Sequence, residues 1–284
     1  MERLPQIPRA AQSTESPLIC REIAPGIHWL GMCVELRHGQ ETFHIHNTSS
    51  YLIKGGSASL LVDTGTPAYW PSLERNLDNL LPASELTWIF PTHLEYPHAG
   101  ALERLLGKYD ATRVIADSDD YEMYFPEQMD RVTHASIGDE LDLGDGYRFT
   151  FLRAPIKDLV NTLWGYERSQ QVMFVADGFA YTHHGLAGTP GEPMHTPAEC
   201  GLFSSELSRR LGPSDAAYLN QEAFWWTRYR DIAPFIEEIR NLVQSYPPKL
   251  IAPAHGGVID DVANFIPIIQ RAHQMAYLGH SRTK

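Results

Sequence analysis

Short apolar segments that end in an acidic or imidazole side chain recur in this chain of 284 residues. WIFPTH ends at His93, VMFVAD ends at Asp177, and LIAPAH ends at His255. Such segments are typical of buried strands, and a polar group at the end of one costs free energy unless it is paired or binds a ligand. Taken singly, each residue is more often a turn, a cap or a loop residue. Three such strand ends together indicate one shared site.

The hydrophobic periodicity switches repeatedly between strand and helix patterns. Strand patterns occupy IAPGIHWLGM, TFHIHNTSSYLI, SASLLVDTG, LTWIFPTH, TRVIA, DELDLGDGYRFTFLRAP, QQVMFVADGF and KLIAPAHGG. Helix patterns occupy 69–81, AGALERLLGKY, 222–246 with a break near Pro234, and 261–279, whereas 183–201 is an irregular segment rich in Gly and Pro. This order predicts an α/β (α+β) fold in which helices cover two sheets, as a four-layer αββα sandwich.

The domain organisation predicted from these patterns is simple. Residues 1–17 are rich in Pro, Ser and other polar residues, which predicts a flexible N-terminal arm. No segment between 18 and 284 has the composition of a linker between domains. We therefore expect a single domain over 18–284.

Charge and cysteine content exclude several classes of partner and location. The chain has 23 Lys and Arg against 35 Asp and Glu, a net charge of −12, which argues against nucleic acid and anionic membranes. Its three cysteines are far apart with no CxxC pair, so we expect neither a disulfide framework nor a zinc-thiolate site. No segment resembles a signal peptide or a membrane span. These features predict a cytoplasmic protein.

The strongest local motif is PTHLEYPHAG, an HxExxH pattern that contains His93, Glu95 and His98. It lies between a predicted buried strand and a predicted helix, where side chains of a strand-to-helix loop can converge on one point. Two imidazoles and a carboxylate form a mixed nitrogen and oxygen donor set that suits iron, zinc or manganese. The motif therefore predicts metal binding.

These motifs together resemble the metallo-β-lactamase-fold superfamily, and within it the flavodiiron branch. SSYLI followed by LLVDTG is similar to the opening strands of the superfamily, which implies that Asp63 is its supporting acidic residue. The superfamily usually has HxHxDH, whereas the flavodiiron branch has HxExDH, which His93 and Glu95 match. APIKDLVNTLWGY, VADGF, AYLNQ and APAHG are similar to later segments of that branch. The resemblance covers about Glu22 to Ile259.

The resemblance implies a two-metal centre with Asp177 as the bridging ligand. The first metal would be held by His93, Glu95, Asp158 and Asp177, and the second by His98, Asp177 and His255. The pattern departs from the family in two places. Pro97 replaces an Asp ligand of the second metal, which leaves that site with one ligand fewer. The family's next His aligns best with Asp158, although a shift by one residue would put Lys157 there.

Other side chains are candidates for substrate contact or for replacing the lost ligand. His44 and His46 lie in one strand pattern, and His183 and His184 follow Asp177. Each is more often a structural histidine when taken alone. Trp225 belongs to an aromatic segment, 222–229, that could line a pocket, although we prefer to assign this segment to the core.

The donor set favours redox chemistry at a non-haem iron centre. Glu95 hardens the first site and suits iron that cycles between Fe(II) and Fe(III). The resemblance thus implies a diiron protein that binds or activates O2. It would act as an oxidoreductase or oxygenase on a small substrate, an aromatic one included, or as an oxygen-binding protein. Flavodiiron proteins receive electrons from a flavodoxin-like FMN domain. We expect no FMN domain in this chain, and hence a separate electron donor.

Two alternatives remain open at this point. One is a metal-dependent hydrolase, in which metal-bound hydroxide attacks an ester, thioester or activated ether and Asp177 or Asp158 accepts a proton. Zinc or manganese would then replace iron. The other is a sensor or scaffold with a decayed site, which the retained ligand residues disfavour. The sequence leaves the oligomeric state open, a homo-oligomer included.

Overall fold

The structure of the chain is a computed structural model that describes residues 18–38, 41–82, 85–183 and 197–275. For 35–38 and 41–47 it describes the backbone alone. The predicted arm, 1–17, lies outside the described residues. Within the described part, none of the helices is both long enough and apolar enough to span a bilayer.

The first sheet has seven strands in chain order, β1 (Leu18–Ala24), β2 (Ile27–His38), β3 (Glu41–Lys54), β4 (Ser59–Val62), β5 (Trp88–Phe90), β6 (Arg113–Ala116) and β7 (Val132–His134). Strands β1 to β4 pair antiparallel, and β4 to β7 pair parallel. The Pro25-Gly26 turn joins β1 to β2, and Gly26 has a φ of 69°, which glycine adopts without strain. The strand pattern IAPGIHWLGM therefore forms an antiparallel hairpin.

The second sheet has five strands in the order β12 (Leu250–Ala252), β11 (Val172–Phe174), β10 (Leu163–Glu167), β9 (Tyr147–Arg153) and β8 (Glu140–Gly144). Strands β11 and β12 are parallel, and the other neighbours are antiparallel. Each sheet thus contains parallel strands whose carboxyl ends are followed by loops, the usual place for a site in such sheets.

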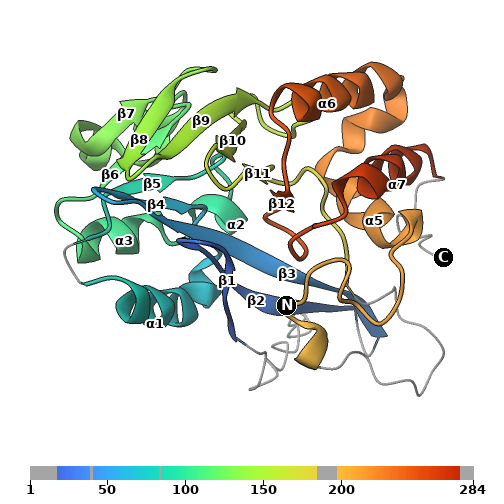
Figure 1. Ribbon diagram of the computed structural model, residues 1–284, viewed down its shortest axis with the longest axis horizontal. Coiled ribbons are helices and arrows are strands. Elements are labelled where there is room, and N and C mark those ends of the chain that lie inside the picture. The colour runs from blue at the N-terminus through green and yellow to red at the C-terminus, as the bar shows by residue number, and fades with distance from the viewer. Residues whose placement is uncertain (1–17, 39–40, 83–84, 184–196, 276–284) are drawn as a thin grey trace, which may run out of the picture.

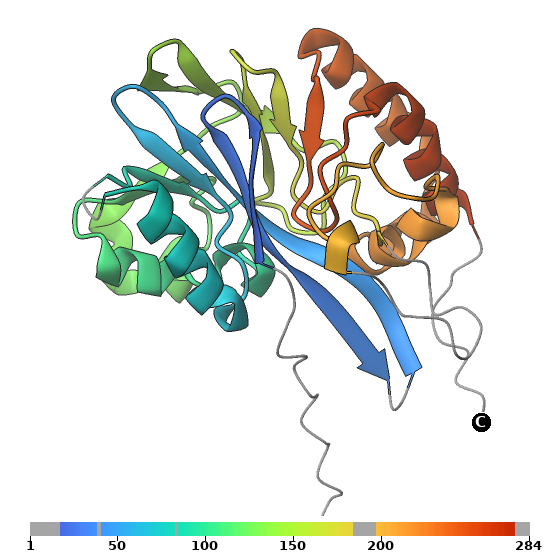
Figure 2. The same cartoon turned by 60° about the horizontal axis from the view of Figure 1, so that its bottom comes forward.

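Helices cover the outer faces of both sheets (Figures 1 and 2). On the first sheet lie α1 (Trp70–Leu80), α2 (Tyr96–Ala99), α3 (Leu102–Lys108) and α4 (Tyr121–Tyr124); on the second lie α5 (Pro213–Ala223), α6 (Ala233–Ser245) and α7 (Val262–Gln274). Short 3-10 helices are η1 (Pro67–Tyr69), η2 (Pro126–Arg131), η3 (Pro197–Glu199) and η4 (Trp225–Tyr229). The structure confirms the four-layer αββα sandwich.

Aromatic side chains join the two sheets across their inner faces. Phe90 of the first sheet contacts Phe149 and Phe151 of the second edge to face, with ring centroids 5.5 Å and 5.0 Å apart. Tyr51 and Phe174 make a similar contact at 5.4 Å. Such pairs add to the free energy gained by burying the rings. The packing fixes the positions of the loops that leave both sheets.

Of the predicted helix 222–246, only the part from Ala233 to Ser245 is a continuous α-helix beyond the end of α5. Helix α5 ends at Ala223, the chain continues through η4, and α6 begins at Ala233. Pro234 lies in the first turn of α6, where its missing N–H costs nothing, so it begins a helix and does not interrupt one. The segment LWGYE, which the periodicity did not identify as a strand, forms β10.

Gly165 of β10 provides a test of the packing between adjacent strands. A Cβ at this position would lie 2.0 Å from Cζ of the buried Phe149 ring. We expect Gly165→Ala to lower the free energy of unfolding by about 1–3 kcal/mol in urea titrations, because the ring must move within a filled core. Gly107→Ala is the control, since nothing lies within 4 Å of its Cβ in α3 and alanine favours a helix. Equal stability of the two variants would contradict the packing described.

Candidate metal centre

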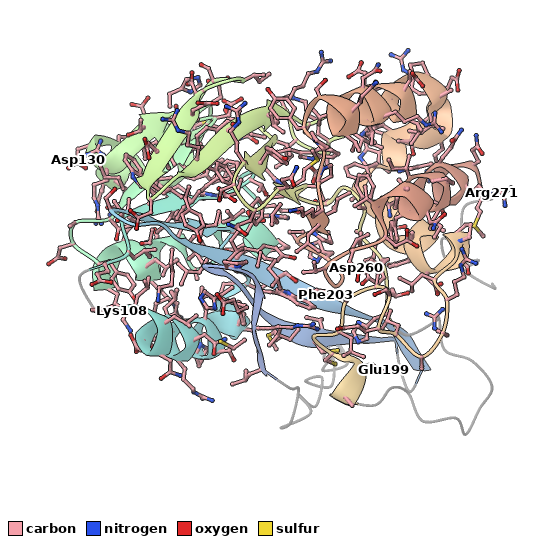
Figure 3. The ribbon with its side chains drawn as sticks, in the orientation of Figure 1. Lys108, Asp130, Glu199, Phe203, Asp260 and Arg271 are labelled. Carbon is pink, nitrogen blue, oxygen red and sulfur yellow. The ribbon has the colours of Figure 1, made fainter. Side chains whose placement is uncertain are left out.

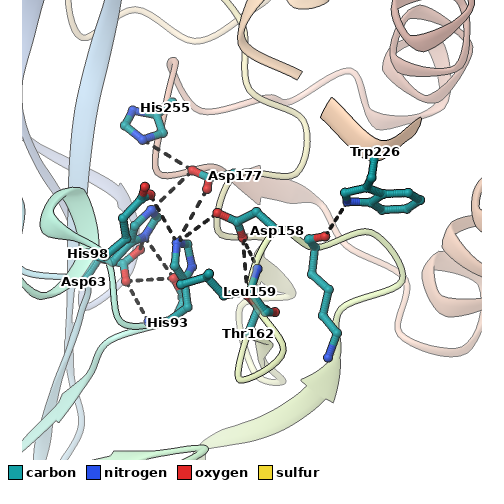
Figure 4. Close-up of polar contacts among 12 residues, drawn as sticks. Asp63, His93, His98, Asp158, Leu159, Thr162, Asp177, Trp226 and His255 are labelled. Carbon is teal, nitrogen blue, oxygen red and sulfur yellow. Dashed lines mark hydrogen bonds and ion pairs between the residues drawn. The ribbon is translucent and has the colours of Figure 1, made fainter. Parts of the chain in front are cut away.

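Four strand ends meet where the two sheets adjoin (Figure 4). Asp63 follows β4 and His93 follows β5 in the first sheet, while Asp177 follows β11 and His255 follows β12 in the second. Backbone hydrogen bonds connect each sheet to a segment that follows a strand of the other sheet, close to these strand ends. The Leu163 N–H donates to the Thr92 carbonyl oxygen at 2.9 Å, and the Ser49 N–H to the Ala254 carbonyl oxygen at 2.9 Å.

Asp177 lies at the centre of the cluster. Its Oδ1 is 3.2 Å from Nε2 of His98 and 3.3 Å from Nε2 of His255, and its Oδ2 is 3.6 Å from Nε2 of His93. The side chain is only 5% exposed. One carboxylate therefore faces three imidazoles, with one oxygen toward His93 and the other toward His98 and His255. This is the arrangement that a bridging carboxylate requires.

Several of these buried atoms have no hydrogen-bond partner among the described residues, namely Nε2 of His93, Nε2 of His98 and Oδ1 of Asp177. Buried polar atoms are nearly always paired, because leaving one unpaired costs about 1–3 kcal/mol. Ligand atoms that share one ion lie about 3.0–3.6 Å apart when metal–ligand bonds are about 2.1–2.2 Å long. The spacing and the missing hydrogen bonds both fit a metal ion among these atoms.

Asp63 holds the imidazole of His98 in one orientation. Its Oδ2 lies 3.0 Å from His98 Nδ1, and its Oδ1 accepts hydrogen bonds from the Thr92 N–H at 2.8 Å and the Thr92 hydroxyl at 2.9 Å. A carboxylate on Nδ1 places the proton there and leaves the lone pair of Nε2 for a metal. The supporting position that the resemblance implied for Asp63 is therefore seen in the contacts of its carboxylate.

The backbone is strained on both sides of the cluster. Asp63 has a φ of 57°, and Ala176, which precedes Asp177, has a φ of 48°. An L-residue in the left-handed region costs roughly 1–2 kcal/mol. Such conformations persist where the surrounding structure imposes them, and they gather at functional sites.

Glu95 and Asp158 complete the group around His93. Oε2 of Glu95 and Oδ2 of Asp158 each lie 3.6 Å from His93 Nε2. The Glu95 side chain is 54% exposed and borders solvent, whereas that of Asp158 is 15% exposed. The Leu159 N–H donates to Asp158 Oδ1 at 2.8 Å, which orients the other oxygen toward His93.

The sequence left open whether Asp158 or Lys157 occupies the position of the family's next His ligand. In the structure, Asp158 is the one that lies in the cluster. The Lys157 ammonium donates instead to the Val160 carbonyl oxygen at 2.5 Å, and the Lys157 carbonyl oxygen accepts a hydrogen bond from Trp226 Nε1 at 2.9 Å. Pro97 lies in the first turn of α2, where proline is well tolerated, and its ring offers no ligand atom.

The charges of the cluster shift the pKa values of its members in different directions. Burial would raise the pKa of Asp177, but the imidazoles of His98, His255 and His93 lower it well below its ordinary value. Burial would lower the pKa of His98, but Asp63 and Asp177 raise it well above the ordinary value. Burial raises the pKa of Asp158. The two carboxylates nearest His93 in the interior thus differ in proton affinity.

The other candidate residues lie elsewhere or are not described. His184 lies outside the described residues, and the side chains of His44 and His46, both in β3, are not described. His183 is buried, and the sulfurs of Cys33 and Cys200 each lie 3.6 Å from its Nε2, so these two cysteines lie close together in space despite their separation in sequence. Trp225 is 57% exposed, so the preferred assignment of this residue to the core is wrong.

Sequence reasoning missed Thr92, which contacts both the Asp63 carboxylate and, at 3.0 Å, Nδ1 of His98. Its position immediately before His93 in the strand-end motif was the available signal. No signal in the sequence indicated that Cys33 and Cys200 both lie beside His183, because their segments meet only in the folded chain.

Comparison with known proteins agrees with the fold. The family model of the metallo-β-lactamase superfamily matches residues 45–199, more than half of the chain. The chain therefore belongs to the metallo-β-lactamase superfamily. The matched segment contains all the clustered residues except His255.

Among curated proteins, the anaerobic nitric oxide reductase flavorubredoxin of Salmonella typhi is 29% identical over 247 residues, which are 83% of this chain and 47% of that protein. A homolog of this reductase in Escherichia coli O157:H7 is also 29% identical over 247 residues, 55% of its length. The chain spans about half the length of the curated relatives it matches. These relatives are consistent with the flavodiiron-like branch.

Solved structures share the fold. Rubredoxin:oxygen oxidoreductase of Desulfovibrio gigas superposes with a TM-score of 0.71 at 18% identity, covering 90% of this chain and 61% of that one. A diflavin flavoprotein fragment from Nostoc has a TM-score of 0.71 at 15% identity, covering 92% of this chain and 98% of the fragment.

The support that Asp63 provides can be tested by its isosteric amide. We expect Asp63→Asn to weaken metal binding by about 10- to 100-fold in competition titrations with a chelator, because the amide no longer fixes the proton on His98 Nδ1. Asp110→Asn, an exposed change next to the same sheet, is the control and should bind metal as the wild type does. Unchanged affinity in Asp63→Asn would show that His98 is not a ligand.

Asp158 and Lys157 provide an adjacent pair of variants. We expect Asp158→Ala to lower the metal content of the purified protein, since it removes a carboxylate oxygen facing His93. Lys157→Ala should keep the wild-type content, because the ammonium lies on the Val160 carbonyl oxygen. The reverse pattern would assign the position to Lys157.

Proposed function

We propose that this chain is a diiron oxidoreductase that reduces or activates a small oxidant, with O2 as the first candidate, using electrons from a separate donor. The observation that carries the proposal is the buried Asp177 carboxylate, which faces imidazoles on two sides at 3.2–3.6 Å. The curated relatives are named as nitric oxide reductases, and one structural neighbour as an oxygen oxidoreductase. Both names support a redox function for the branch.

The donor set supports iron as the metal. Around His93 lie three carboxylates, those of Glu95, Asp158 and Asp177. Carboxylates are hard ligands that stabilise the ferric state, whereas a site made only of imidazoles suits zinc or copper equally well. Two iron ions held here would store two electrons and offer open coordination positions to an oxidant.

The residues of the chain have distinct tasks in this proposal. Asp177 would join the two metal positions, and Asp63 would keep His98 Nε2 available to the second. Pro97 in place of a ligand would leave more of the second position open. Glu95, at the solvent border, would mark the side from which a small molecule enters. Asp158, whose Oδ2 lies 3.6 Å from His93 Nε2, would be a further carboxylate ligand of the first position.

Metal analysis combined with oxygen kinetics tests this function. Protein purified under air should contain about two irons per chain, and the chemically reduced protein should consume O2 when the two are mixed. Glu95→Ala and His255→Ala should each lower the iron content and slow the reaction, whereas the exposed changes Glu103→Ala and His134→Ala should do neither. Zinc as the sole metal, with ester or thioester hydrolysis under argon, would instead establish the hydrolase.

A further inference from the structure

A second cluster of metal-ligand side chains lies apart from the carboxylates and imidazoles of the first. Cys33, in β2, and Cys200, just after η3, approach the same atom, Nε2 of His183. Both sulfur–nitrogen distances are 3.6 Å, and the three ligand atoms all lie within 4.8 Å of one another. Figure 3 labels Glu199, the residue before Cys200, at the end of η3.

The two distances match the geometry of tetrahedral zinc. With Zn–S bonds of about 2.3 Å and Zn–N bonds of about 2.0–2.1 Å, sulfur and nitrogen ligands of one ion lie about 3.5–3.6 Å apart. Hydrogen bonding explains the arrangement less well. One ring nitrogen offers either a single N–H or a single lone pair, so it cannot make a well-directed hydrogen bond to two thiols at once.

Hydrogen bonds to the backbone beside His183 and Cys200 hold these two members in place, and Cys33 lies in the paired strand β2. The Thr182 N–H, next to His183, donates to the Asp215 carbonyl oxygen at 2.9 Å. The Gly201 carbonyl oxygen, next to Cys200, accepts a hydrogen bond from Arg21 Nη1 at 2.9 Å. The side chains of Cys33 and His183 are each only 2% exposed. Preorganised and desolvated ligands of this kind favour binding of an ion over hydration of the separate groups.

We propose that Cys33, His183 and Cys200 bind a zinc ion at a site separate from the carboxylate–imidazole centre. Two thiolates and an imidazole form a soft donor set that selects Zn²⁺, whereas the carboxylates around His93 suit a harder ion. Two thiolate charges would balance the charge of the ion in this buried place. The ion would link segments 150 residues apart and thereby stabilise the contact between β2 and the loop that follows β11.

Cobalt substitution tests the site, because a thiolate-bound Co²⁺ has a sulfur-to-metal charge-transfer band in the near ultraviolet. Chain freed of bound metal by a chelator should develop this band on titration with Co²⁺, and Zn²⁺ should abolish it. Cys33→Ser and Cys200→Ser should lack the band. Cys20→Ser is the matched control, since Cys20 is the exposed third cysteine outside the cluster. Glu95→Ala should keep the band, which separates this site from the first.

A measurement on the unaltered chain guards against variants that fail to fold. Zn²⁺ should slow alkylation of Cys200 by about tenfold or more, because a metal-bound thiolate is a poor nucleophile, and should leave Cys20 unaffected. Three results would overturn the proposal: no charge-transfer band in the wild type, loss of the band in Cys20→Ser, or a Cys33–Cys200 disulfide in the native protein without zinc.

Discussion

Burial of the Asp177 carboxylate is the constraint on which the arrangement of this molecule depends. A buried carboxylate is stable only when polar partners, opposite charge or a metal surround it, and here the imidazoles of His93, His98 and His255 face it at 3.2–3.6 Å. Those histidines come from both sheets, so the carboxylate requires the sheets to adjoin at this edge. The aromatic contacts of Phe90 and Tyr51 across the interior set the same relative position. Packing and electrostatics therefore specify one geometry.

The fold could be predicted largely from hydrophobic periodicity, because most strands and helices bury one regular set of apolar side chains. The αββα layers followed from the order of these patterns. The predictions failed where local signals competed. Pro234 was interpreted as a break within a helix, yet it lies in the first turn of α6. Strand β10, LWGYE, is buried at every residue. Its sequence therefore does not alternate between apolar and polar residues, and the period-2 pattern that identifies a half-buried strand is missing.

The candidate centre could be located from the sequence because its members follow strands that share one edge. The motif placed His93, Glu95 and His98 together, and the contacts of Asp158 resolve a choice that spacing alone left open. The cluster of Cys33, His183 and Cys200 could not be found this way. Cys33 and His183 are separated by 150 residues and lie on segments with no common pattern, so only the folded chain brings them together. The spacing of residues along the sequence therefore detects a site formed within one loop better than a site formed by segments that are distant in the sequence.

The contacts between β3 and the segment after β12 also set the order in which the centre can form during synthesis. The Tyr51 hydroxyl donates to the Pro253 carbonyl oxygen across 202 residues, and Thr48 pairs with His255 beside it. Chains emerge from the ribosome N-terminus first. Strand β3 can therefore form its contacts with Pro253 and His255 only after most of the described chain has been synthesised. His93 and Asp177 thus leave the ribosome well before the histidine that completes their cluster. The proposed metal ions can be held in the final geometry only by a chain whose last strand has paired.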